Sequence, residues 1–245
     1  MAAAVGHSLG QDHVGTEDRI LLLACGALAR EVLAVTKANG LDHVDLKCLP
    51  AELHMRPDAI TDAVRDAIHR HRPQYDKVFV LYADCGTGGL LDAMLEEEGV
   101  ERIAGPHCYS FFEGNELFAT QAKDEITTFY LTDFLVRQFE SFVIKPMGLD
   151  RWPELADTCF AHYEKLVYLA QTDDLDLDEK AKTAADRLGL KFERRYTGYR
   201  DMGSFIQKVA APASVEHDRA EAALVMDDFL SEVSAPTDTL VAWKN

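Results

Sequence analysis

The chain has 245 residues, of which 47% are hydrophobic, so it can bury the core of one large domain or of a domain with an appendage. Its formal net charge of −17 argues against a surface that binds nucleic acid or an anionic membrane, because phosphate binding needs clustered lysine and arginine. It contains no run of about 18 apolar residues, as a membrane helix requires, and residues 1–17 lack the pattern of a signal peptide. We therefore expect a cytoplasmic protein whose partners are small molecules or other proteins.

The pattern of apolar runs predicts three segments: a mobile leader over residues 1–18, a single α/β domain over 19–208, and a C-terminal acidic helix and tail over 209–245. Within the domain, strands and helices alternate. The expected strands cover residues 20–24, 43–48, 77–83 and 100–104, and the expected helices cover 27–38, 58–71 and 88–98. This alternation predicts a doubly wound, Rossmann-like parallel sheet with strand order of about 2-1-3-4.

The C-terminal half is predicted to be mostly helical. Apolar residues at helical spacing indicate amphipathic helices over 125–142 and 154–169, with Cys159 in the core face of the second. The acidic segment 173–178 is typical of a helix N-terminus, and 191–196 is expected to be an added strand.

Four of the five cysteines lie at or just after the end of a predicted strand. In an open parallel sheet those ends share the edge where ligands bind, so Cys25, Cys48, Cys85 and Cys108 are expected to converge. Zinc takes cysteine and histidine ligands, and Cys25, Cys85, and His107 or Cys108 would supply three or four of them. Iron or an iron–sulfur cluster is an alternative if Cys48 joins the site. A buried packing role is the competing interpretation for each cysteine, and for Cys48 it is the favoured one.

The loop at residues 84–89, Asp-Cys-Gly-Thr-Gly-Gly, suggests a second kind of site. A glycine-rich turn before a helix directs backbone amides at an anion, so this loop is a candidate cofactor-binding element. It superficially resembles the glycine loop of methyltransferases that use S-adenosylmethionine, although it starts with an acid and follows the third strand rather than the first. The candidate cofactor-binding residues are Gly86, Thr87, Gly88 and Gly89.

Three further residues are candidates for catalysis: Asp84, Arg30 and Glu113. Arg30 lies one turn into the first helix and could equally form a surface ion pair. Glu113 is a candidate proton carrier, and an exposed loop acid is the alternative interpretation. His54 is expected either to bind a carboxylate or phosphate or to form hydrogen bonds within its loop.

Several short motifs resemble the domain-of-unknown-function family 1638. They are Cys-Gly-Ala-Leu at 25–28, the glycine-rich loop at 84–89, His-Cys-Tyr at 107–109 and Phe-Tyr-Leu-Thr-Asp-Phe at 129–134. The resemblance covers about residues 19–205. It implies a cytoplasmic prokaryotic protein often found beside corrinoid-dependent methyl-transfer systems. It also implies an acid directly after the His-Cys-Tyr element, where this chain has Ser110, with Glu113 as the nearest substitute.

These observations lead to one principal hypothesis and two alternatives. The principal hypothesis is a zinc-binding protein of one-carbon metabolism that acts in thiol- or corrinoid-linked methyl transfer, because a metal holds a thiol as thiolate. One alternative is a non-catalytic accessory or assembly factor that docks on a corrinoid protein or methyltransferase. The other is a metal-free enzyme that uses Cys85 as nucleophile, or a binder of S-adenosylmethionine or a nucleotide.

Overall fold

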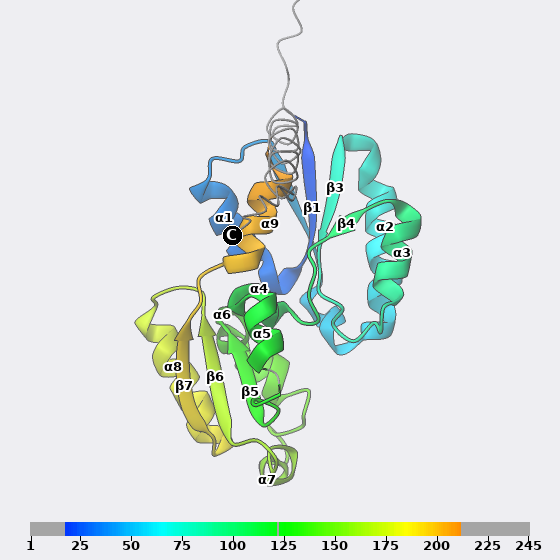
Figure 1. The fold of residues 1–245 in the computed structure, drawn as a ribbon. Helices are drawn as coiled ribbons and strands as arrows, with labels where there is room; N and C mark the ends of the chain where they lie inside the picture. Colours follow the sequence, from blue (N-terminus) through cyan, green and yellow to red (C-terminus); the bar gives the residue numbers. More distant parts are fainter. Residues whose placement is uncertain (1–17, 122, 212–245) are drawn as a thin grey trace, which may run out of the picture. The chain divides into compact units, whose positions relative to one another are not determined.

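The computed structural model describes residues 18–121 and 123–211, and the described residues up to Ala210 belong to one compact unit (Figure 1). The predicted leader, apart from Asp18, and the predicted acidic tail from residue 212 onward lie outside the described residues. No helix in the described part of the chain is both long enough and apolar enough to cross a membrane.

The first half is the predicted doubly wound sheet. Its four parallel strands have the order β2-β1-β3-β4, as the sequence predicted. The strands are β1 (Ile20–Cys25), β2 (Val44–Leu49), β3 (Lys77–Leu81) and β4 (Glu101–Arg102). Every residue of β1 is buried, because the strand is central and both of its faces are covered.

Helices cover both faces of this sheet (Figure 1). They are α1 (Ala29–Ala38), α2 (Ile60–His71) and α3 (Leu90–Glu98). Short 3₁₀ turns precede α1 at Gly26–Leu28, lie between β2 and α2 at Ala51–Met55 and Pro57–Ala59, and follow α2 at Arg72–Gln74. Helix α2 packs against α3, and its buried residues Ile60, Val64 and Ile68 recur at helical spacing, which explains its place on the sheet.

The second half contains a sheet that the sequence analysis did not predict. Its parallel strands have the order β5-β6-β7. They are β5 (Thr128–Thr132), β6 (Lys165–Ala170) and β7 (Lys191–Tyr196), and only β7 was expected. The helices predicted over 125–142 and 154–169 are therefore wrong over β5 and β6, because short apolar runs fit a buried strand as well as a helical turn.

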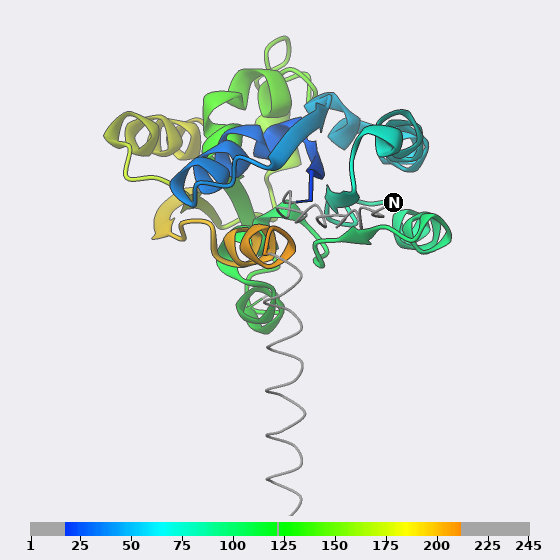
Figure 2. The same ribbon diagram turned by 90° about the horizontal axis from the view of Figure 1, so that it is seen from above.

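Helices still make up most of this half. They are α4 (Cys108–Glu113), α5 (Asn115–Gln121), α6 (Asp133–Arg137), a π-helical turn (Glu140–Ile144), α7 (Leu155–Cys159), α8 (Leu175–Leu188) and α9 (Arg200–Val209). The predicted helix start near residues 173–178 is confirmed, since the Asp174 carboxylate caps α8 by accepting from the amides of Asp176 and Leu177. Helix α9 (orange in Figures 1 and 2) returns to the first half and packs on α1 and α4.

Two cysteines lie in surroundings different from those expected. Cys159 is exposed at the end of α7, because that helix has only five residues and does not bury this position. Cys48 is also exposed, because β2 is an edge strand of its sheet. The packing roles predicted for both residues are therefore wrong.

Candidate active site

The carboxyl edge of the first sheet brings two thiols together. Cys85 lies in the loop after β3, and Cys108 is the first residue of α4. Their Sγ atoms are 4.0 Å apart, at the outer limit of a sulfur hydrogen bond. The backbone φ of Cys85 is 48°, a left-handed conformation that side chains other than glycine rarely adopt and that is found at functional sites. These two residues form the centre of the site.

The imidazole of His54 is the second partner of Cys85. It comes from the 3₁₀ turn at Ala51–Met55 and lies close enough to the Cys85 sulfur to influence its ionisation. The hydrogen bond with Cys108 has the largest effect on the pKa of Cys85, and it lowers that pKa. Burial raises the pKa, whereas the interaction with His54 and the charge of His54 lower it further. The net result is a pKa of about 5 for Cys85. The interaction with Cys85 correspondingly raises the pKa of His54. Cys85 therefore has the character of a thiolate at neutral pH, and the neighbouring imidazole favours that form.

The partner thiols remain protonated. The hydrogen bond with Cys85, followed by burial, raises the pKa of Cys108. Burial raises the pKa of Cys25, the last residue of β1, to about 11. The hydroxyl of Tyr82 lies close to Cys25, yet it has no hydrogen-bond partner of normal geometry among the described residues. Only Cys85, of these three cysteines, is thus prepared to act as a nucleophile at neutral pH.

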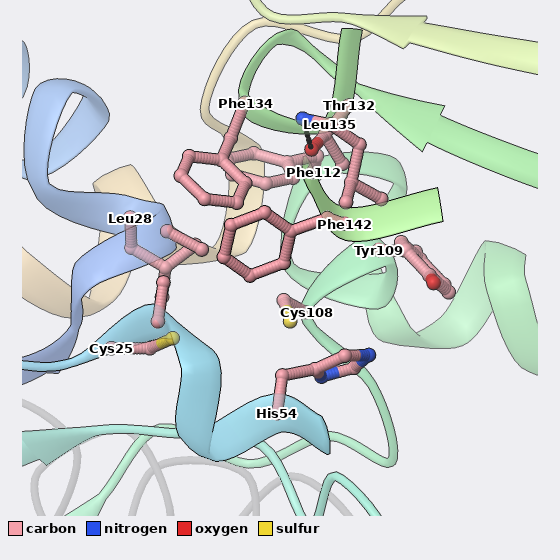
Figure 3. Close-up of a pocket in the computed structure, with 12 residues that line it drawn as sticks. Cys25, Leu28, His54, Cys108, Tyr109, Phe112, Thr132, Phe134, Leu135 and Phe142 are labelled. Atoms are coloured by element: carbon pink, nitrogen blue, oxygen red, sulfur yellow. Dashed lines mark hydrogen bonds between the residues drawn. The ribbon is translucent and has the colours of Figure 1, made fainter. Parts of the chain in front are cut away.

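An apolar cavity adjoins the thiol pair (Figure 3). Its empty volume is about 440 Å³, part of which is open to solvent. In Figure 3 the sulfur atoms of Cys25 and Cys108 and the ring of His54 lie on one side of the cavity, and aromatic rings lie opposite them. Cys85 itself is not part of the lining, but both of its partners are. The apolar lining residues are Leu28, Tyr109, Phe112, Phe134, Leu135 and Phe142.

The second half of the chain completes this cavity. Thr132 ends β5, Phe134 and Leu135 lie in α6, and Phe142 lies in the π-helical turn. The Thr132 hydroxyl accepts a hydrogen bond from the Leu135 amide and caps α6. The motif at residues 129–134 thus supplies lining residues far in sequence from the cysteines, which the sequence analysis did not expect.

His107, one of the predicted metal ligands, faces a different environment from Cys108. Its ring packs 6.0 Å from the ring of Tyr109 and 6.4 Å from that of Phe118, measured between centroids. It is not part of the cavity lining, although its charge helps to lower the pKa of Cys85.

The glycine-rich loop is stabilised by its own first residue. The Asp84 carboxylate accepts hydrogen bonds from the Thr87 hydroxyl at 2.7 Å, the Gly89 amide at 2.9 Å and the Gly88 amide at 3.3 Å. These bonds, led by that of Thr87, lower the pKa of Asp84. A carboxylate of the chain therefore occupies the place that a phosphate takes in an anion-binding loop. Gly86 and Thr87 line a separate groove beside α2 and α3 rather than the apolar cavity.

The remaining candidates for catalysis lie outside the cavity lining. Arg30 is exposed on α1. Glu113 is buried in α4 rather than exposed in a loop, and its Oε1 accepts a hydrogen bond from Arg195 at 2.8 Å. Ser110 is also buried, and its hydroxyl donates to the carbonyl of His107. The carboxylates of Glu113 and Asp84 thus have structural partners, and neither is among the main influences on the pKa of Cys85.

The sulfur separation can be compared with that in a zinc site. Two thiolates on a tetrahedral zinc, at about 2.3 Å from the metal, lie about 3.8 Å apart, close to the 4.0 Å found for Cys85 and Cys108. Within residues 18–121 and 123–211, however, no three His, Cys, Asp or Glu side chains are arranged to hold a metal ion. The spacing of the sulfur pair fits zinc, but a third ligand is not in place among the described residues.

The fold and the site define an α/β protein with a pair of neighbouring thiols at the carboxyl edge of a parallel sheet. The chain belongs to the family described as protein of unknown function (DUF1638), whose model matches residues 48–206. The expected family membership is therefore confirmed. No curated protein and no solved structure matches the chain.

Proposed function

We propose that the protein is an enzyme whose reactive group is the Cys85 thiolate, and that it accepts or transfers a small alkyl group, such as a methyl group, in one-carbon metabolism. The observation that supports the proposal is the 4.0 Å separation of the Cys85 and Cys108 sulfurs with His54 nearby, an arrangement that lowers the pKa of Cys85. The choice of a methyl group comes from the family resemblance.

The cavity supports a substrate with a small apolar body. Its lining is mostly aromatic and aliphatic, and a thiolate at the edge of such a site is exposed to less water than one on the surface. Desolvation of this kind favours attack on a neutral electrophile. An S-alkyl group formed at Cys85 would have an apolar space beside it.

The chemical step is a nucleophilic displacement. The Cys85 sulfur uses a lone pair to form a bond to the methyl carbon, while the bond between that carbon and the donor breaks and its electron pair leaves with the donor. No proton is transferred in this step, because Cys85 is already ionised. His54 favours the thiolate beforehand and loses that interaction once the sulfur is alkylated.

Methylation of the intact protein tests this proposal. The full chain, the variant Cys85→Ser and the matched control Cys48→Ser would each be incubated with methylcobalamin and analysed by mass spectrometry. We expect one added methyl group on the peptide containing Cys85 in the wild type and in Cys48→Ser, and none in Cys85→Ser. Methylation that persists in Cys85→Ser, or none in the wild type, would contradict the proposal.

Zinc binding is the second candidate property, favoured by the 4.0 Å separation of the Cys85 and Cys108 sulfurs. A third protein ligand would have to move into place, because none of the described side chains stands there. Elemental analysis of protein purified without oxygen decides this point. About one zinc per chain in the wild type and none in Cys85→Ser would support a metal site, and no zinc in either protein would refute it.

The accessory role stays a prediction. Its docking element, the acidic helix, lies outside the described residues. Deletion of the residues after position 212 should abolish binding to a corrinoid protein while leaving the reactivity of Cys85 unchanged, and retained binding would contradict it.

A further inference from the structure

A second thiol stands beside the reactive one. The Cys108 Sγ is 4.0 Å from the Cys85 Sγ, and two backbone hydrogen bonds hold their segments together. The amide of Asp84 donates to the carbonyl of Gly105 at 3.1 Å, and the amide of Cys85 donates to the carbonyl of Pro106 at 3.2 Å. The two cysteines therefore remain neighbours, although 23 positions separate them in sequence.

We propose that Cys85 and Cys108 act as a dithiol that exchanges with small disulfides, with Cys108 as the resolving cysteine. The inference rests on the reactive sulfur of the proposed function and adds a second activity to it. The described residues contain three other cysteines, and no sulfur–sulfur contact joins any of them to this pair. A disulfide bond is about 2.05 Å long, so the two sulfurs must approach by about 2 Å through side-chain rotation and a small shift of the loop.

The exchange proceeds in two displacements. The Cys85 thiolate attacks one sulfur of the substrate disulfide, forms a mixed disulfide and releases the other sulfur as a thiolate. The Cys108 sulfur then attacks the Cys85 sulfur, and the second half of the substrate leaves. The proton of Cys108 passes to a leaving sulfur, and His54, which lies near Cys85, is placed to carry it. The protein pair is oxidised to a disulfide, and the substrate disulfide is reduced to one thiol and one thiolate.

The surroundings of the pair indicate the kind of disulfide. The cavity beside Cys108 is lined mostly by apolar side chains, including Phe112 and Phe142. A disulfide with small, uncharged, apolar or aromatic substituents matches this lining, whereas a bulky, strongly charged one does not. The chain's formal charge of −17 also disfavours an anionic disulfide.

The test uses the reduced full chain and the aromatic disulfide dithiodipyridine. Trypsin cleaves the chain after Arg102, so Cys85 lies in the peptide 78–102 and Cys108 lies in the peptide 103–123. We expect wild type and the matched control Cys48→Ser to release both halves of the probe, to lose the mass of two hydrogen atoms and to yield these peptides linked by a disulfide. The variant Cys108→Ser should instead retain one half of the probe on Cys85. Because Cys108 is the largest influence on the pKa of Cys85, this variant is expected to react more slowly, and the readout is the half of the probe retained at completion rather than the rate.

The outcomes separate this inference from the proposed function. A stable mixed disulfide on Cys85 in the wild type, without linkage to Cys108, overturns the inference but leaves the reactive thiolate standing. Absence of any reaction at Cys85 overturns both. The wild-type linkage is read without any variant, so a folding defect in Cys108→Ser cannot obscure the result.

Discussion

The ionisation of Cys85 can be tested most sharply by the pH profile of its alkylation. The free thiol has a pKa of 9.0, and its surroundings lower this value to about 5. At pH 5.5 the ionised fraction of Cys85 should exceed that of an ordinary cysteine about 2,000-fold. A thiolate of lower pKa is less nucleophilic, however, by about 40- to 100-fold for four pKa units at a Brønsted slope of about 0.4–0.5.

The larger ionised fraction and the lower nucleophilicity of Cys85 act in opposite directions, so its alkylation rate should exceed that of an ordinary cysteine at low pH and fall below it at high pH. If alkylation follows the same slope, Cys85 should react about 20- to 60-fold faster than an ordinary cysteine at pH 5.5, at a similar rate near pH 7, and more slowly above pH 8. The measurement is the rate of iodoacetamide labelling of each cysteine peptide from pH 4 to 9. Cys159, which is exposed at the end of α7, is the internal reference.

Removal of His54 should shift this profile. The variant His54→Gln loses the positive charge beside Cys85, so the midpoint should move upward by about one pH unit or more. The matched control is His69→Gln, since His69 is exposed on α2 and bonds to Glu98 instead. A Cys85 midpoint near 9, or one that His54→Gln and His69→Gln affect equally, would refute the reasoning.

Two further predictions concern stability. Arg195, and to a lesser extent Lys165, lowers the pKa of Glu125 to about 2. The ionised Glu125 therefore stabilises the fold above pH 4.5, and this contribution is lost as the pH falls toward 2. Arg195→Met should lower the free energy of unfolding in urea by about 3 kcal/mol. This value is the lower end of the range for breaking a buried pair, because 21% of the Arg195 side chain is exposed. An unchanged unfolding midpoint in urea and an unchanged acid transition would contradict this prediction. Gly26→Ala should destabilise the protein by about 1–3 kcal/mol, because a Cβ there would lie 2.9 Å from the carbonyl oxygen of Leu49; an unchanged melting temperature would contradict it.

The first half of the fold could be predicted because its local signals agree. Strand β1 is a continuous apolar run, and the helix after it ends at Asn39 and Gly40, where the sequence has a stop signal. The second half lacks such signals. The segments of β5 and β6 are five and six residues long and apolar, and tertiary packing rather than periodicity decides that they are strands.

The site could be predicted only in part. Cys85 and Cys108 lie close together because both follow strands that end at the same carboxyl edge of the first sheet. The contact of His54 with Cys85 depends on a 3₁₀ turn 31 positions earlier, and no local pattern specifies it. The contribution of Phe134 and Phe142 depends on a second sheet, and the sequence pattern predicts helices over two of its three strands, β5 and β6.

The Asp84 carboxylate has a consequence for how a substrate would meet the site. Anion-binding loops of similar composition use backbone amides to hold a phosphate, but here the amides of Gly88 and Gly89 already have an internal counter-charge. The loop is therefore ordered as soon as the chain folds, and a bound ligand is not needed to order it. Cys85 is presented in its left-handed conformation in advance, so the entropy of ordering this loop does not weaken substrate binding.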